Sequence, residues 1–390
     1  MTISPQVKIR TLFLLILLAA FPPLSTDMYL PILPSLSHMW GVPAATINLS
    51  LVGFFASFSL ALLIYGPLSD RFGRKPVLMA GIGLYIIACL VCALSSNPMT
   101  LIIGRVLQGF GAAAASTLSL AMTKDCFHGA ERVRVMAHIA VIVALAPMLA
   151  PVIGGIMLKY VHWSGIFILQ AFLGLIAMGG VARLQEPVSV GIRTLQQVLG
   201  NYFHLMCNLQ FMGLCCLMAL GMMPFFCFIG GSSYIFISHF GLSEQVFSYF
   251  FAFNSAALML GAWICGRLIK ILPNFRIIML GYVGMLGSAI ALALCANMGP
   301  WGMAIPMAIF SMFGGISRPP SNNFLLEQVT IDAGSASSLI MFTYFVSGAI
   351  AMWLIALPWT NKILVLGLVG VCSSILVLVF LPVLGRRKSA

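Results

Sequence analysis

Two ionisable side chains stand inside strongly apolar runs of the sequence. Asp27 lies in STDMYLP, late in the first run, and Arg105 lies in LIIGRVLQGF, early in the fourth. If both runs are membrane-spanning helices, a rise of 1.5 Å per residue puts these groups roughly 12 Å and roughly 9 Å from the same face. An ionised carboxylate there costs at least about 2.5–3.5 kcal/mol unless it is paired or hydrated. We expect Asp27 to pair with Arg105 and to bind a proton when the pair separates, which makes a proton-coupling switch. A static ion pair, or Asp27 at a hydrated helix end, is the alternative.

The segment GPLSDRFGRKP combines an acid, several bases and two glycines. Its first glycine allows close helix approach, and the second permits a tight turn. The acid can cap the following backbone and pair with an arginine. The pattern predicts a charged latch between two helix ends that locks one face closed. A plain basic loop would explain the bases, but neither the acid nor the glycines. The latch residues are Gly66, Asp70, Arg71, Gly73 and Arg74.

The stretch APMLAPVIGG places Pro147 and Pro151 four residues apart, followed by Gly154 and Gly155. Each proline removes an intrahelical hydrogen bond and bends a helix. The glycines allow tight packing against a neighbouring helix. Because proline and glycine are common in spanning helices, the pattern is not specific. We interpret it as a hinge.

Arg318 stands in SRPPSNN, in the tenth apolar run. The double proline is expected to interrupt the helix, and broken helices with polar groups often line substrate cavities. Alternatively, Arg318 lies at a helix end and reaches the lipid headgroups. Buried amides and aromatic side chains are further candidates for a cavity wall. The candidate cavity residues are Tyr29, Asn48, Gln108, Tyr234, Asn254 and Arg318.

A second chemistry is suggested by sulfur. Met218 and Met222 are four residues apart, close to Cys215, Cys216 and Met223. Soft sulfur ligands on one helix face suit Cu(I), although methionine also fills apolar gaps. The six histidines form no close cluster, and no nucleotide-binding motif is present. We therefore predict neither an enzyme nor a cofactor or metal site, and keep import of copper or another small solute through this sulfur-rich seventh run as the alternative function.

The elements that must position these groups follow from composition. Of 390 residues, 61% are hydrophobic and 7% charged, whereas a soluble domain has about 25% charged residues. The excess apolar surface must face lipid, and a spanning helix needs about 20 apolar residues. The sequence predicts an all-α membrane protein with twelve spans: 11–35, 46–66, 76–96, 99–122, 135–158, 163–183, 205–237, 244–266, 275–297, 300–326, 335–358 and 363–384.

Lys and Arg set the expected orientation. With the N-terminus in the cytoplasm, sixteen of the 20 Lys and Arg residues fall inside. This distribution explains the net charge of +12 without a nucleic-acid partner. A polar linker, 184–203, is expected to separate an N-terminal six-helix half (1–183) from a C-terminal one (204–390). The loops GPLSDRFGRK and AWICGRLIKI form a faint repeat between the halves, and duplicated units are typical of transporters.

These motifs together resemble the major facilitator superfamily. The loop G-x-x-x-D-R-x-G-R-K, the R-x-x-Q-G run and APMLAPVIGG are similar to motifs of its twelve-span drug:proton antiporters, although Ala150 replaces a usual glycine. PLSTDMYLPILP, IYGPLSDRFGRKPV and AGSASSL resemble the bicyclomycin/chloramphenicol resistance (Bcr/CflA) branch.

The resemblance implies proton-driven export of small amphipathic compounds across the bacterial inner membrane by alternating access. It implies roles in coupling for Asp27 and Arg105, and in the latch for Asp70, Arg71 and Arg74. Arg318 departs from the expected pattern and favours an anionic or zwitterionic substrate. The expected partners are a small-molecule substrate, protons and the lipid bilayer, and we expect a monomer.

Overall fold

The computed structural model is helical throughout the parts of the chain that it describes, residues 5–184, 195–329 and 333–385, apart from short connections. Twelve helical segments among these residues are long and apolar enough to cross a membrane. The twelve spans expected from hydropathy are therefore confirmed. A helix satisfies its own backbone hydrogen bonds, which is what an apolar segment needs in lipid.

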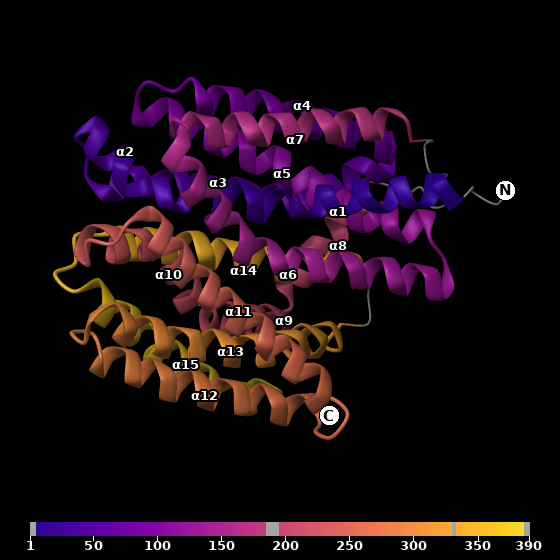
Figure 1. Ribbon diagram of the computed structural model, residues 1–390. Coiled ribbons are helices and arrows are strands. Elements are labelled where there is room, and N and C mark those ends of the chain that lie inside the picture. The colour runs from indigo at the N-terminus through magenta and orange to yellow at the C-terminus, as the bar shows by residue number, and fades with distance from the viewer. Residues whose placement is uncertain (1–4, 185–194, 330–332, 386–390) are drawn as a thin grey trace. The chain divides into compact units, whose positions relative to one another are not determined.

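The chain divides into two compact units, and the first comprises Met1–Ile32 and Gly53–Val198. In this unit α4 packs against α5 and α7, and α1 packs against α5 and α6 (Figure 1). Its elements are α1 (Pro5–Asp27), the short 3-10 turn η1 (Leu30–Ile32), α3 (Ala44–Phe72) from Gly53 onward, α4 (Arg74–Ala93), α5 (Pro98–Cys126), α6 (Gly129–Tyr160), α7 (Ser164–Ala182) and the start of α8 (Leu195–Cys207).

The second unit comprises Leu33–Val52 and Leu199–Ala390. Here α13 packs against α11 and α12, α12 packs against α15, and α14 packs against α9 and α10. This unit includes the first turns of α3 and most of α8. Its other elements are α2 (Leu33–Trp40), α9 (Leu209–Gly221), α10 (Met223–Ser233), the π-helical turn η2 (Tyr234–His239), α11 (Glu244–Leu268), α12 (Asn274–Leu294), α13 (Gly299–Leu326), α14 (Ala333–Ala356) and α15 (Lys362–Gly385).

Two spans are interrupted. The first span, Arg10–Trp40, consists of α1, η1 and α2, so the helix stops directly after Asp27. The seventh span runs over Leu209–His239 as α9, α10 and η2. Its predicted start at residue 205 was wrong, because residues up to Cys207 belong to the separate helix α8.

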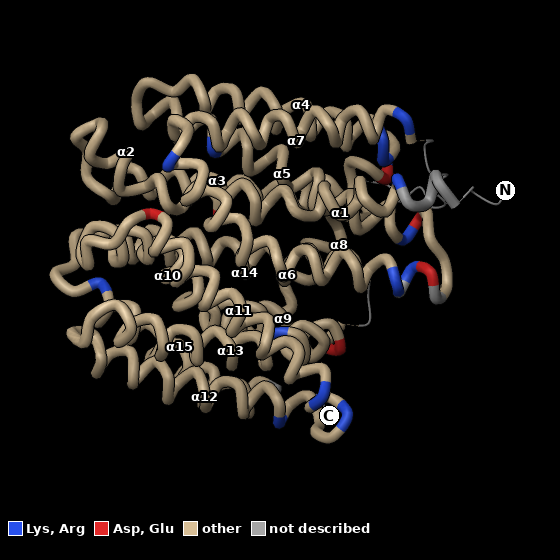
Figure 2. The backbone as a smooth tube through the Cα atoms, viewed as in Figure 1, with Lys and Arg blue, Asp and Glu red and all other residues tan. Residues whose placement is uncertain are grey.

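Charged residues avoid the middle of the helices. In each unit most Lys and Arg lie toward helix ends, and the central stretches carry few charges (Figure 2). The linker predicted over 184–203 lies partly outside the described residues, while 195–203 belong to α8. The division into two six-helix halves therefore stays a prediction.

Candidate functional site

Arg105 is fully buried in α5, within the first unit. Its guanidinium carbon lies 4.7 Å from the centre of the Tyr29 ring and 4.5 Å from that of Phe54. Nη1 donates to the backbone carbonyl of Ser25 at 2.9 Å and to the side-chain oxygen of Gln108. Aromatic faces attract a desolvated cation, so this arrangement holds a positive charge in the membrane without an acid.

Gln108 extends this cluster to two further helices. Its amide nitrogen donates to the side-chain oxygen of Gln170 on α7 at 2.7 Å and to the Cys89 sulfur on α4 at 3.1 Å. Gln170 in turn donates to the carbonyl of Leu24 on α1 at 3.1 Å. The structure therefore unites three predicted residues, Tyr29, Arg105 and Gln108. Gln170 was missed, although a lone amide in an apolar run is the signal that identified Gln108.

The helices that carry this cluster pack closely against one another. A Cβ on Gly109 would collide with the backbone of Phe54 on α3, and one on Gly111 would collide with the backbone of Tyr85 on α4. Small residues are what lets backbones approach this closely in a membrane. The small residues after Arg105 thus serve helix packing.

Asp27 is buried at the end of α1, with 5% of its surface exposed. Its carboxylate accepts a hydrogen bond from the Thr26 hydroxyl at 2.8 Å. Asp27 and Arg105 both belong to the described residues, yet no ion pair joins them. The predicted pair is therefore wrong for this structure. Instead, the Arg105 guanidinium contacts two ring faces, a carbonyl and an amide, and Asp27 bonds to Thr26.

The predicted hinge stretch abuts the break after Asp27. In α6, a Cβ on Gly154 would collide with the backbone carbonyl of Met28. Pro147 and Pro151 lie inside α6, which continues unbroken over Gly129–Tyr160, and Gly155 is buried. The tight packing predicted for Gly154 is confirmed, and hinge motion stays a prediction.

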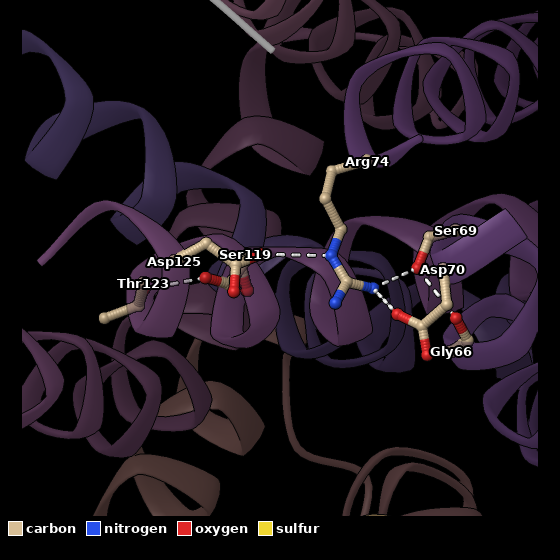
Figure 3. Close-up of polar contacts among 7 residues, drawn as sticks. All are labelled: Gly66, Ser69, Asp70, Arg74, Ser119, Thr123 and Asp125. Atoms are coloured by element: carbon tan, nitrogen blue, oxygen red, sulfur yellow. Dashed lines mark hydrogen bonds and ion pairs between the residues drawn. The ribbon is translucent and has the colours of Figure 1, made fainter. Parts of the chain in front are cut away.

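The charged cluster at the ends of α3, α4 and α5 is centred on Arg74 (Figure 3). Arg74 Nη1 lies 2.6 Å from a carboxylate oxygen of Asp70, and Nε lies 3.1 Å from one of Asp125. Nη1 also donates to the Ser69 hydroxyl. Gly73 has a φ of 95°, so it makes the left-handed turn between α3 and α4. The pairing of Asp70 with Arg74 and the turn at Gly73 are confirmed.

Three details of this cluster differ from expectation. Asp125, at the end of α5, was not predicted, because the sequence does not show which helix end meets Arg74. Arg71 is exposed and lies over Phe72, 5.1 Å from the ring centre. The close helix approach expected at Gly66 was wrong, since a Cβ there meets nothing within 4 Å. In the matching loop of the second unit Gly266 replaces the acid, and Arg267 lies over Trp263 at 3.4 Å.

Three cavity candidates serve helix contacts inside the second unit. The Asn48 amide donates to the Gly230 carbonyl at 2.9 Å. The Tyr234 hydroxyl lies 3.3 Å from the carbonyls of Leu33 and Ala44. Asn254 accepts from the Ser311 hydroxyl at 2.8 Å. These bonds tie α3 to α10, η2 to α2 and α3, and α11 to α13.

Arg318 is half-buried on α13, with its guanidinium carbon 4.4 Å from the centre of the Tyr344 ring on α14. It lines a small cavity with Met218, Met222 and Cys215. The predicted interruption at Pro319 and Pro320 was wrong, because α13 runs unbroken over Gly299–Leu326. Prolines are tolerated in spanning helices where neighbouring helices and polar side chains compensate for the lost backbone bond.

No group of three or more His, Cys, Asp and Glu side chains in the described parts of the chain is arranged to hold a metal ion.

Residues 15–352 match the family model described as Major Facilitator Superfamily. The chain belongs to this superfamily. It is thus a membrane transporter, and its twelve spans make it a multi-pass protein of the inner membrane.

Three relatives show which members of the superfamily this chain is similar to. The chain is 31% identical to the uncharacterized MFS-type transporter YdgK of Bacillus subtilis, over 91% of this chain and 90% of that one. It is 28% identical to a bicyclomycin resistance protein homolog of Haemophilus influenzae, over 90% of each chain. It is 24% identical to multidrug resistance protein D of Escherichia coli, over 98% of each. The names of the second and third relatives agree with the branch that the sequence motifs predicted.

A solved superfamily structure confirms the fold. The crystal structure of a D-xylose-proton symporter superposes with a TM-score of 0.75 at 14% identity, covering 98% of this chain and 99% of that one. At this identity the likeness concerns the fold alone.

Proposed function

We propose that this protein exports small amphipathic compounds from the cytoplasm in exchange for protons. The observation that carries the proposal is Asp27, a buried carboxylate at a helix break with a single hydroxyl donor and no cation paired to it among the described residues. Burying an ionised carboxylate is costly, and binding a proton removes that cost. The resistance names of two relatives support export of drug-like compounds.

Arg105 supplies the other half of the proposed switch. Its Nε and Nη2 are buried without a hydrogen-bond partner in the part of the chain that the structure describes. Its Nη1 holds the carbonyl of Ser25, two residues before Asp27. When Asp27 releases its proton, the new charge attracts these donors and shifts the end of α1 against α5. Proton release is thereby linked to helix movement.

The proton gradient is an adequate source of energy for this exchange. One charge moving across about 100 mV gains about 2.3 kcal/mol, and about 1.4 kcal/mol corresponds to a tenfold ratio. One proton per substrate therefore sustains a substrate gradient of roughly fiftyfold from the potential alone.

The test is proton movement in liposomes containing the purified protein, recorded while bicyclomycin or chloramphenicol is added. We expect compound-driven proton flux in wild type and none in Asp27→Asn. Glu131→Gln removes an exposed carboxylate at the start of α6 and serves as the control with retained flux. Undiminished flux in Asp27→Asn would contradict the assignment of coupling.

Import of copper is the second candidate, because Cys215, Met218 and Met222 line one cavity. The same liposomes given Cu(I) discriminate the two functions. Proton flux that is driven by Cu(I) would favour copper over organic compounds if it persists in Asp27→Asn and disappears in the double variant Met218→Leu/Met222→Leu.

We also propose that both termini lie in the cytoplasm and that the protein acts as a monomer, since one chain carries all twelve spans. The asymmetry of Lys and Arg supports this orientation. Fluorescence of a C-terminal green fluorescent protein fusion, without activity of the matching alkaline phosphatase fusion, tests it.

A further inference from the structure

A small cavity in the second unit lies between α9, α12, α13 and α14. Its polar lining comes from Arg318, Asn322 and the serines of α13, together with Tyr282 and Tyr344. Its apolar lining includes Met218, Met222, Leu325 and Ile340. A cavity with a few convergent polar groups and mostly apolar walls is the usual form of a small-molecule site.

Arg318 is the single charged residue of this lining. No hydrogen bond or ion pair joins it to any residue in the described parts of the chain, and its contact is the face of the Tyr344 ring. The N–H groups of Arg318 therefore have no acceptor among the described residues and are available to a ligand. Two parallel N–H groups fit the two oxygens of a carboxylate.

The Tyr344 hydroxyl is an independent sign of a ligand. The side chain is 9% exposed, and its oxygen is buried without a hydrogen-bond partner over the described ranges 5–184, 195–329 and 333–385. Phe226 and Phe345 hold the ring, with centres 4.9 Å and 5.5 Å away. A buried polar group without a partner is expensive, and Tyr344 lines the cavity beside Arg318. An acceptor bound there would satisfy both groups.

The neighbouring walls indicate what the rest of such a ligand is like. Met218 and Met222 are flexible, polarizable side chains that adapt to varied apolar shapes. The cavity volume is about 20 Å³, which is room for about one water molecule. A carboxylate therefore enters only if the methionine side chains move aside, and an apolar body then lies against them.

We propose that this cavity binds the carboxylate of an amphipathic organic acid through Arg318 and Tyr344. The proposal rests on the proposed export function and names its substrate class, organic anions and zwitterions with an apolar body. Tyr344 donates its hydroxyl proton to one carboxylate oxygen while Arg318 neutralises the charge. Neutral amphipathic compounds lack this contact and bind less tightly.

The test is binding to the purified full-length protein in detergent, measured by isothermal titration calorimetry with 3-phenylpropionate and its amide. The two probes share an apolar body and differ only in the charged group. We expect the carboxylate to bind at least about tenfold more tightly than the amide. The preference should disappear in Arg318→Gln, fall in Tyr344→Phe and be partly kept in Arg318→Lys, which retains charge but loses the two-pronged geometry.

Retained binding of the amide by Arg318→Gln shows that the variant is folded. Equal affinity for both probes in wild type, an unchanged preference in Arg318→Gln, or no carboxylate binding up to millimolar concentration would overturn the proposal. Because binding needs no proton gradient, Asp27→Asn should keep the preference. Failure of proton coupling and failure of this site are therefore separate results.

Discussion

At the scale of single residues, Arg74 is held by two carboxylates from different helices. Asp70 lies four residues before it, on α3, and Asp125 lies in the last turn of α5, and both are about a quarter exposed. We predict that Asp70→Asn and Asp125→Asn each slow transport, on the order of tenfold or about 1.4 kcal/mol. Because both act through Arg74, the double variant should be little slower than the slower single one.

A double-mutant cycle on initial rates of compound-driven proton flux measures this coupling. Arg132→Gln is the matched control, since this arginine is exposed at the start of α6, and it should transport like wild type. Fully additive losses in the double variant would show that the two acids act independently of Arg74.

Residue-level prediction from sequence succeeds where partners are near in the chain. Asp70 and Arg74 are four residues apart and were predicted to pair. Asp125 and Tyr344 meet Arg74 and Arg318 through the packing of separate helices, and spacing carries no record of that packing. Asp27 and Arg105 were matched by depth alone. Depth does not reveal that Tyr29 and Phe54 enclose the guanidinium.

At the scale of elements, α6 is packed against the break between α1 and η1. Gly154 touches the Met28 carbonyl so closely that a Cβ would overlap it. We predict that Gly154→Ala displaces α6 from this break and lowers the transport rate at least about tenfold, because the backbone beside Asp27 no longer fits. Proton-flux rates in liposomes at matched protein content give the measurement.

Gly179→Ala is the control for that variant. Gly179 also lies in a spanning helix, α7, but a Cβ there meets nothing within 4 Å. Alanine favours helix by up to about 1 kcal/mol over glycine, so this variant should be at least as stable as wild type and equally active. Equal activity of the Gly154 and Gly179 variants would show that the close approach is not needed for transport.

The spanning helices were predicted from the sequence better than the contacts between residues were, for a physical reason. A run of about 20 apolar residues leaves helix as the only spanning solution in lipid, so all twelve spans were recovered. Breaks were not recovered. Pro319 and Pro320 lie within a continuous α13, whereas the first span breaks after Asp27, beyond Pro22 and Pro23 inside α1. Whether a proline ends a helix depends on neighbouring helices that compensate for the lost bond, which local sequence does not encode.

At the scale of the whole molecule, the two proposed sites together determine how transport responds to membrane potential. One proton entering through the Asp27 site moves one positive charge inward. A carboxylate leaving from the Arg318 site moves one negative charge outward, and both movements are favoured when the inside is negative. A one-to-one cycle therefore moves two charges with 3-phenylpropionate and one charge with its amide.

This difference gives a prediction for the intact transporter in liposomes whose potential is clamped with potassium and valinomycin. Each charge contributes about 2.3 kcal/mol per 100 mV. The steady-state gradient of the amide should therefore change roughly fiftyfold per 100 mV, and that of the carboxylate by the square of this factor. Equal dependence of the two gradients on membrane potential would mean that each anion leaves together with a proton, in addition to the proton that enters. In that case coupling stoichiometry, rather than the Arg318 cavity, would set the charge moved per cycle.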